Sequence, residues 1–340
     1  MNEQIKNYKE LLELANNYPS PHNGQPIRVK KTSDIEFELY FEKQRGLQAT
    51  DISFIFSFVS MGVFVEHIKL SAIALGHRIA VELKLPNESE LKGEGLVIFA
   101  KAKIDWNVAA PKQDLLSAIK FRQTSRKKYY EGIPEEISQN VSNIAGQANM
   151  SLVQLNKRQT KQAIWLNQRA VFDDMFDEPV RLELDHWLRY DQTEKQLKKD
   201  GLAYDCMELN GKVIKYIVDH PGLLRAKGLD WLIKQYYLRT MSDNSNVFYM
   251  MAPFRTGIEA YKVGEVVMKV WQVFSESGYY LHPFGTIMSN HKAHHDFLDL
   301  VNVHNESLEE SYLVLIFRAG KSKTPVRSLR IPINEHLILE

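Results

Sequence analysis

The sequence predicts an α+β protein made of two related parts, and three observations support this prediction. Short strands with alternating apolar residues are interspersed with helices both before and after residue 112. Each part contains one long apolar segment, at 52–76 and at 258–277, and each segment stops at a glycine. Each glycine is followed, after a connection of different length, by a strongly hydrophobic strand.

The first part, residues 1–112, opens with a helical face formed by Leu11, Leu12, Leu14 and Ala15. This helix stops at the run Tyr18 to Pro26, which is rich in turn-forming residues. Strands are then predicted at 27–31, 35–41, 78–85 and 96–104, with the long helix 52–76 between the second and third.

The second part, residues 113–340, begins with predicted helices at 113–121 and 135–148 and a strand at 151–155. Residues 160–256 are rich in aromatic and charged residues and are predicted to be a mostly helical lid. The long helix 258–277, a helix at 291–303 and a strand at 312–317 complete the chain.

The two long apolar segments resemble each other in detail. Gly62 and Gly76 are separated by the same number of residues as Gly264 and Gly278, with bulky apolar residues at shared positions between them. An internal duplication accounts for this pattern, and so does chance matching of two amphipathic core helices.

Composition excludes several classes of function. Lys and Arg number 43 against 42 for Asp and Glu, so no overall charge points to nucleic acid or to a membrane surface. The single cysteine, Cys206, rules out an intrachain disulfide and multi-cysteine metal sites, and it fits a reducing cytoplasm. The amino-terminal segment lacks the apolar core of a signal peptide, so we expect a cytoplasmic location and no membrane partner.

Residues 19–26, PSPHNGQP, form the first candidate binding segment. Three prolines and a glycine restrict the backbone, while Ser20, His22, Asn23 and Gln25 present short polar groups. Such pre-ordered donors and acceptors suit the edge of a flat heteroaromatic ligand. An ordinary polar turn between a helix and a strand is the alternative interpretation.

Residues 122–126, RQTSR, form the second candidate segment. Alternate residues of an extended segment point the same way, so Arg122, Thr124 and Arg126 can converge on one anion. The planar guanidinium fork suits a phosphate monoester, and the hydroxyl adds a donor. A solvated basic loop is the alternative.

Two more segments lie near the carboxyl terminus. In 281–286, LHPFGT, Pro283 and Gly285 bracket Phe284 and expose backbone amides to a ligand that approaches closely; a plain loop is the alternative. After the last apolar strand, Arg327 and Arg330 either close on the same phosphate or are surface charges.

Together these segments resemble the nitroreductase superfamily. PSPHNGQP is similar to its PSxxNxQPW segment, with Ile27 in place of the tryptophan, and RQTSR to its R-x-[ST]-x-[RK] phosphate segment. LHPFG resembles the loop that faces flavin N5, and the basic tail resembles the terminal phosphate clamp. The order of the segments resembles the longer, single-chain Acg-like branch, in which two fused halves mimic two subunits.

The resemblance implies a nitroreductase fold: two intertwined halves, each an antiparallel sheet packed by long central helices. It implies one FMN site, with the phosphate held by Arg122, Thr124 and Arg327 or Arg330. Arg126 would approach the N1/O2 edge, and amides near Phe284 and Gly285 would face N5. The implied flavin-binding set is Pro19, Ser20, His22, Asn23, Gln25, Arg122, Thr124, Arg126, Pro283, Phe284, Gly285, Arg327 and Arg330.

The expected activity is electron transfer from NADH or NADPH through FMN to a nitro compound or a quinone. No side chain needs to act as a nucleophile or base, because the flavin carries the chemistry. The alternative is a protein that stores or sequesters FMN without turnover, with the middle segment as a cover. The chain is expected to be a monomer with an internal pseudo-dimer, or a homodimer.

Other motifs give weaker signals. His291, His294, His295 and His304 lie close together, but no HExxH or carboxylate scaffold accompanies them, so no metal site is predicted. GxGxxG after a strand, the Walker loop and the GxSxG elbow are missing from the sequence.

Overall fold

The computed structural model describes residues 3–51, 54–226, 228–303 and 311–339. It confirms the α+β class, with antiparallel sheets packed by long helices. His304, one of the clustered histidines, lies outside the described residues.

The first sheet has the strand order β11-β1-β2-β4-β3. Its strands are β1 (Ile27–Lys31), β2 (Glu36–Glu42), β3 (Arg78–Leu83), β4 (Leu96–Asp105) and β11 (Ile338–Leu339). All neighbours are antiparallel except β11, which pairs parallel with β1. Because β11 comes from the carboxyl terminus, the second part of the chain reaches back and extends the sheet of the first.

The second sheet has the order β5-β8-β10-β9, with all pairs antiparallel. Its strands are β5 (Ser151–Gln154), β8 (Asn246–Ala252), β9 (Tyr280–Pro283) and β10 (Tyr312–Gly320). Taken in chain order, these four strands occupy the same places as β1, β2, β3 and β4 in the first sheet. The prediction of a helical stretch to residue 256 is therefore wrong over β8, whose apolar residues fill a central sheet position.

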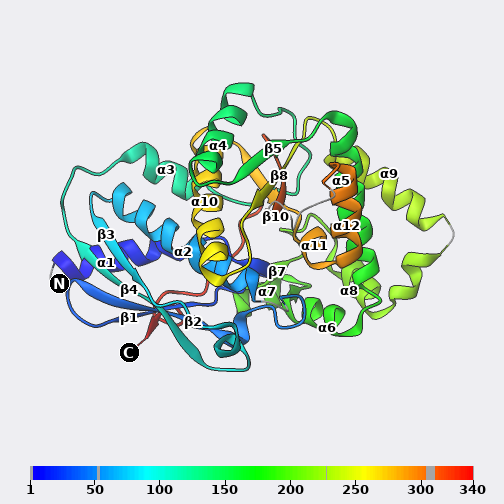
Figure 1. Cartoon of the computed structure of the whole chain (residues 1–340). Coiled ribbons are helices and arrows are strands. Elements are labelled where there is room, and N and C mark those ends of the chain that lie inside the picture. Colours follow the sequence, from blue (N-terminus) through cyan, green and yellow to red (C-terminus); the bar gives the residue numbers. More distant parts are fainter. Residues whose placement is uncertain (1–2, 52–53, 227, 304–310, 340) are drawn as a thin grey trace.

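Two long helices cross between the sheets (Figure 1). They are α2 (Ile55–Ala74) and α10 (Gly257–Glu276), the two segments that resemble each other in sequence. A methyl group on Gly62 would overlap the carbonyl oxygen of Tyr261, and one on Gly264 would overlap that of Val59. The matched glycines thus lie where the backbones meet, because only a residue without Cβ permits so close an approach.

The core consists mainly of apolar side chains between these helices and the two sheets, among them Phe64, Val65, Met268 and Phe274. Helix α2 is long and apolar enough to cross a membrane, but 72% of its most apolar stretch is buried inside the protein. Its hydrophobicity is accounted for by this central position. The remaining helices of the two parts are α1 (Glu3–Ala15), α3 (Gln113–Phe121), α4 (Glu135–Gln147), α11 (Gly285–Ser289) and α12 (His291–Leu300).

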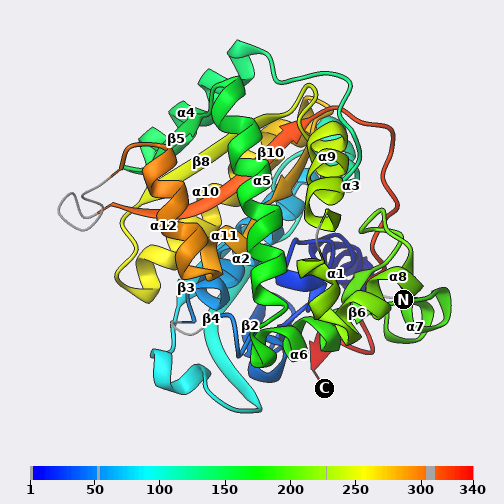
Figure 2. The ribbon, with the colours of Figure 1, turned by 90° about the vertical axis from the view of Figure 1, so that its right-hand side faces the viewer.

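A helical insert separates β5 from β8, and we define it as residues 157–242. It contains α5 (Lys157–Asp174), α6 (Glu178–Trp187), α7 (Gln192–Lys198), α8 (Gly211–Asp219) and α9 (Leu229–Met241), with two short paired strands, β6 (Leu188–Arg189) and β7 (Leu202–Ala203). Four short 3-10 helices do not alter this layout: Pro21–Asn23, Lys43–Arg45, Glu88–Leu91 and, inside the insert, Pro221–Arg225. In Figure 2, α5 runs across the face that is turned toward the viewer, with α6, α8 and α9 beside it. The insert has its own small apolar cluster, which includes Met175, Ile214, Val218 and Leu224.

Candidate functional site

One large cavity, with a volume of about 810 Å³, lies between the insert and the rest of the chain. The proline-rich turn, the RQTSR segment, the loop after β9 and the basic tail all contribute to its wall. Eleven of the thirteen predicted site residues line it: Pro19, Ser20, His22, Asn23, Arg122, Thr124, Arg126, Pro283, Gly285, Arg327 and Arg330. Four segments far apart in the sequence therefore meet around one space.

Gln25 and Phe284 do not line the cavity. Gln25 is fully buried, and its side chain bonds the carbonyl oxygens of Asn23 and Lys199 and the amide of Ile331. The amide of Phe284 donates to the Ile316 carbonyl oxygen at 2.8 Å, so it is not free to face a ligand. Internal hydrogen bonds occupy both groups, and of the predicted neighbours Phe284 and Gly285 only Gly285 lines the cavity.

The proline-rich turn is held in an unusual backbone conformation. His22, Asn23 and Gln25 all have positive φ values, of 48°, 56° and 53°, in the region that favours glycine. Such residues persist only where the surroundings fix them, and they concentrate at functional sites.

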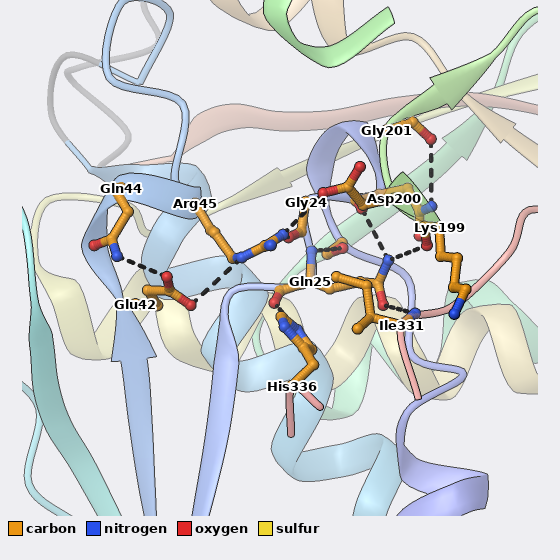
Figure 3. Close-up of polar contacts among 12 residues, drawn as sticks. Gly24, Gln25, Glu42, Gln44, Arg45, Lys199, Asp200, Gly201, Ile331 and His336 are labelled. Atoms are coloured by element: carbon orange, nitrogen blue, oxygen red, sulfur yellow. Dashed lines mark hydrogen bonds and ion pairs between the residues drawn. The ribbon is translucent and has the colours of Figure 1, made fainter. Parts of the chain in front are cut away.

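The fixing contacts come from the insert and from the tail (Figure 3). Gln25 joins all three segments through Lys199 and Ile331. Arg45 bonds the Gly24 carbonyl oxygen at 2.9 Å and pairs with Asp200 at 3.1 Å. Asn23 donates to the carbonyl oxygens of Gly201 and Leu329. The turn is thus clamped on both sides.

The RQTSR segment is extended and docks beside β9. Thr124 forms an isolated parallel bridge with Leu281. Ser125, which points away from the cavity, is fully buried and contacts Ser322 at 2.8 Å. The fully buried guanidinium of Arg318 donates to the carbonyl oxygens of Ser125 and Lys127 and holds the segment in place. Arg122, Thr124 and Arg126 all line the cavity, and so does Gln123, so Ser125 is the one residue of the segment that does not.

Four arginines surround this end of the cavity, and within the described part of the chain none of them pairs with a carboxylate. Arg122 bonds the Asn17 carbonyl oxygen and lies 5.0 Å from the centre of the Trp271 ring. Arg330 bonds the Tyr18 carbonyl oxygen at 3.0 Å, and Arg327 bonds that of Lys120. Arg126 donates to the Cys206 carbonyl oxygen at 3.2 Å.

Burial and mutual repulsion depress the pKa values of these arginines. The pKa of Arg122 is lowered by burial and by the nearby charges of Arg330 and Arg327. Burial lowers the pKa of Arg330 to about 10. Clustered, desolvated cations without counter-charges are costly unless an anion joins them, which indicates an anion-binding site.

Polar atoms without partners gather around the same space. The cavity-lining residues with a buried polar atom that has no hydrogen-bond partner within the protein are His22, Asn23, Ser60, Arg122, Gln123, Asn167, Trp271 and Arg330. The donors among them include Nε of Arg122, Nη1 of Arg330 and Nε1 of Trp271. Buried polar groups are normally paired, so this concentration marks a place where a polar ligand binds.

His22 contributes a neutral imidazole. Burial and the charge of Arg126 lower its pKa to about 4, so the ring is uncharged at neutral pH. Its Nδ1 atom is among the unpaired ones. His282, on β9, also has a pKa well below its usual range, because of burial and the charges of Arg126 and Arg318.

Several lining residues escaped the sequence prediction. Trp271 lies on the long helix α10, where an aromatic residue is indistinguishable from core, and Gln123 lies between two predicted residues. Asn167, on α5, had no motif around it. The insert supplies much of the remaining wall, and α2 supplies Phe56, Val59, Ser60 and Val63.

Comparisons with known proteins give distant structural similarities. No family model matches the chain, and a search of curated proteins found no match. The FMN-dependent nitroreductase NfnB from Mycobacterium smegmatis, in complex with NADPH, is 14% identical over 67% of this chain and 98% of that chain, with a TM-score of 0.41. A nitroreductase-like family protein from Bacillus cereus is 13% identical over 66% of this chain and 95% of that chain, with a TM-score of 0.35.

Proposed function

We propose that this chain is an FMN-dependent oxidoreductase of the nitroreductase type, which passes electrons from NADH or NADPH to a small electron-poor acceptor. The observation that carries the proposal is the group of four arginines without carboxylate partners at one end of a large cavity. The charges of Arg330 and Arg327 lie close enough to Arg122 to add to the effect of burial in lowering its pKa, and the charge of Arg327 acts on Arg330 in the same way. A phosphate monoester supplies the charge that this cluster lacks.

The residues present fit FMN. Nε of Arg122 and Nη1 of Arg330 are unpaired donors for the phosphate, and Thr124 adds a hydroxyl to the same wall. Arg126 lies further toward the insert, where a positive charge stabilises a reduced, anionic ring. His22 and Asn23 present unpaired polar atoms from a turn that is already ordered, so little entropy is lost on binding.

Bound FMN supplies the redox chemistry, taking up hydride from NAD(P)H and reducing an acceptor such as a nitro compound or a quinone. The chain's own residues bind and orient the ring. No lining side chain is assigned as a nucleophile or general base.

In this proposal the parts 1–112 and 113–340 take the roles of two subunits. The arginine segment and the tail belong to the second part, and the first part has no equivalent arginine segment. One FMN per chain is therefore expected whether the chain is a monomer or a homodimer. A measured stoichiometry of two FMN per chain would contradict this arrangement.

The size of the insert favours one alternative, an FMN-binding protein that stores the cofactor. Residues of α5, α8 and α9 line the cavity opposite the arginines, so they can cover a bound ring. Slow FMN exchange together with a flavin that NADPH does not reduce would support storage.

A comparison of FMN with riboflavin tests the binding site itself, because the two differ only in the phosphate. Charge-assisted hydrogen bonds contribute about 1.5–3 kcal/mol each, so we expect FMN to bind at least about tenfold more tightly than riboflavin. Quenching of flavin fluorescence measures both affinities. Equal affinities would show that the arginines do not hold the phosphate.

A further inference from the structure

At the end that the insert forms, the cavity wall is mostly apolar, with Asn167 and Gln168 among its uncharged polar side chains. Among the insert residues that line it, within the described chain, Asp174 alone carries a charged side chain. That carboxylate is already bonded to Asn290 at 2.7 Å. The remaining wall includes Phe172, Leu184 and Ile217, and we refer to this end as the apolar chamber.

The side chains of the chamber wall are packed incompletely. Phe172, Leu184, Ile217 and Ile233 are only partly buried, although all four belong to the apolar cluster of the insert. They line the cavity, so the apolar surface that they leave uncovered faces its interior. Apolar surface of this kind is stabilised when an apolar ligand covers it.

The chamber also opens to solvent through apolar residues. Val213 on α8 and Leu232 and Tyr236 on α9 line the cavity, yet they are 56%, 59% and 52% exposed. Residues that are both exposed and cavity-lining mark its mouth. These three exposed residues of the insert are uncharged, so this mouth favours a hydrophobic molecule, whereas the exposed lining residue Arg327 belongs to the arginine end.

Arg126 lies at the junction of the two ends. It lines the cavity and donates to the carbonyl oxygen of Cys206, a residue of the insert. Tyr237 on α9 lies near enough to influence the pKa of Arg126. A ligand in the chamber therefore extends directly toward the place proposed for the flavin ring.

We infer that the apolar chamber binds the hydrocarbon chain of a lipophilic electron acceptor, whose reducible head group lies toward Arg126. The inference rests on the proposed function for the identity of the head group. It narrows the acceptor from any electron-poor compound to one with an extended alkyl chain, such as an alkylated quinone. The volume of about 810 Å³ lies toward the upper end of the usual range for ligand pockets, which leaves room for such a chain beside a cofactor.

Isothermal titration calorimetry tests this inference by measuring the affinities of benzoquinones that differ only in their alkyl chain, from ethyl to decyl. Each methylene buried in the chamber is expected to tighten binding about fourfold until the chamber is filled. The titration requires no turnover and is performed with and without added FMN. If the protein fails to bind FMN but its affinity for the quinones still rises with chain length, the apolar chamber is supported and only the proposed function is overturned.

Two neighbouring variants separate the chamber from the outer surface. Leu232 lines the cavity and Trp231 does not, and both are 59% exposed on α9. Leu232→Lys is expected to weaken decyl-quinone binding at least about tenfold and to leave ethyl-quinone binding unchanged, because it places a charge at the mouth. Trp231→Lys is expected to behave like the wild type. Equal losses in both variants would indicate adsorption to the exposed face and would overturn the inference.

A third variant fills the chamber from inside. Ile217→Trp enlarges a half-buried wall residue, and urea unfolding verifies that the protein remains folded. Selective loss of the longer chains is expected. An unchanged chain-length series in this folded variant would also overturn the inference.

Discussion

The two ends of the cavity are built in opposite ways. The arginine end is formed by segments of the two sheet-containing parts and by the tail, and its backbone is fixed by buried hydrogen bonds at Gln25 and Arg318. The apolar chamber is formed by helices of the insert, whose cluster contains many partly buried residues. A fixed, charged end suits a cofactor that stays bound, whereas a looser apolar end suits a molecule that exchanges.

The largest loss of stability is expected at the crossing of the long helices α2 and α10. Gly264→Ala places a methyl group against the Val59 carbonyl oxygen, which is backbone and cannot move aside easily. We expect a loss of about 3 kcal/mol or more in the free energy of unfolding, measured with urea. Gly146→Ala is the control, because no atom lies near its added methyl group on α4, and it is expected to stabilise by about 0.5–1 kcal/mol. Equal effects would mean that the close crossing is not required.

The next largest loss of stability is expected when the hydrogen bonds that hold the proline-rich turn are removed. Gln25→Ala removes one buried and two partly buried hydrogen bonds, and it leaves the Lys199 carbonyl oxygen and the Ile331 amide without this partner. We expect a loss of about 2–4 kcal/mol in the free energy of unfolding. Gln44→Ala, whose side chain bonds Glu42 at an exposed site, is expected to change stability by less than about 0.5 kcal/mol. A small effect at Gln25 would show that the insert and tail do not fix the turn.

Replacement of a cavity arginine is expected to have a smaller effect, and this effect is on the affinity for FMN. Arg122→Gln should weaken FMN about tenfold or more and riboflavin much less, because only FMN carries the phosphate. Arg169→Gln removes an exposed arginine that pairs with Asp296 outside the cavity, and it should leave both affinities unchanged. Parallel losses for FMN and riboflavin in Arg122→Gln would instead indicate a general disturbance of the site.

The smallest expected effect is on the pH dependence of the free energy of unfolding. Its sign differs between the two ends of the cavity. The pKa of His22 is lowered to about 4 from 6.5, so the unfolded chain binds more protons between these values and stability falls as the pH falls through that window. His22→Gln should reduce this slope by up to about 1.4 kcal/mol per pH unit.

Asp174, in the chamber wall, has the opposite shift. Burial raises its pKa above 3.8, so its contribution to stability is lost as the pH rises through the folded value. Asp174→Asn should therefore change the slope in the opposite sense to His22→Gln. Urea unfolding at several pH values between 4 and 6.5 measures both variants, and slopes that change in the same sense would contradict the assigned environments.

The sequence predicted the fold and the arginine end far better than the chamber. Strand 27–31 and helix 113–121 were predicted with their observed bounds, because strong alternation and amphipathic spacing mark them locally. The strand β8 was missed inside a stretch expected to be helical, since its apolar run reflects a central sheet position that only tertiary pairing reveals.

The same distinction holds for the site residues. Arg122, Thr124 and Arg126 belong to a short motif whose alternate spacing predicted a shared direction, and all three line the cavity, although Gln123 does so as well. Gln25 stood in an equally suggestive motif, yet its side chain bonds the insert and the tail, which are remote in sequence. The chamber residues belong to no motif, because an apolar wall around a cavity has the same composition as an ordinary core.

The visible spectrum of the purified protein with added FMN, recorded before and after anaerobic addition of NADPH, decides whether the chain is a flavin reductase. We expect bands of oxidised, protein-bound flavin that are lost on addition of NADPH. Bands that persist would contradict the reductase and favour FMN storage. A protein that shows no bound flavin even after FMN is added would contradict the assignment of the arginine end as a flavin site.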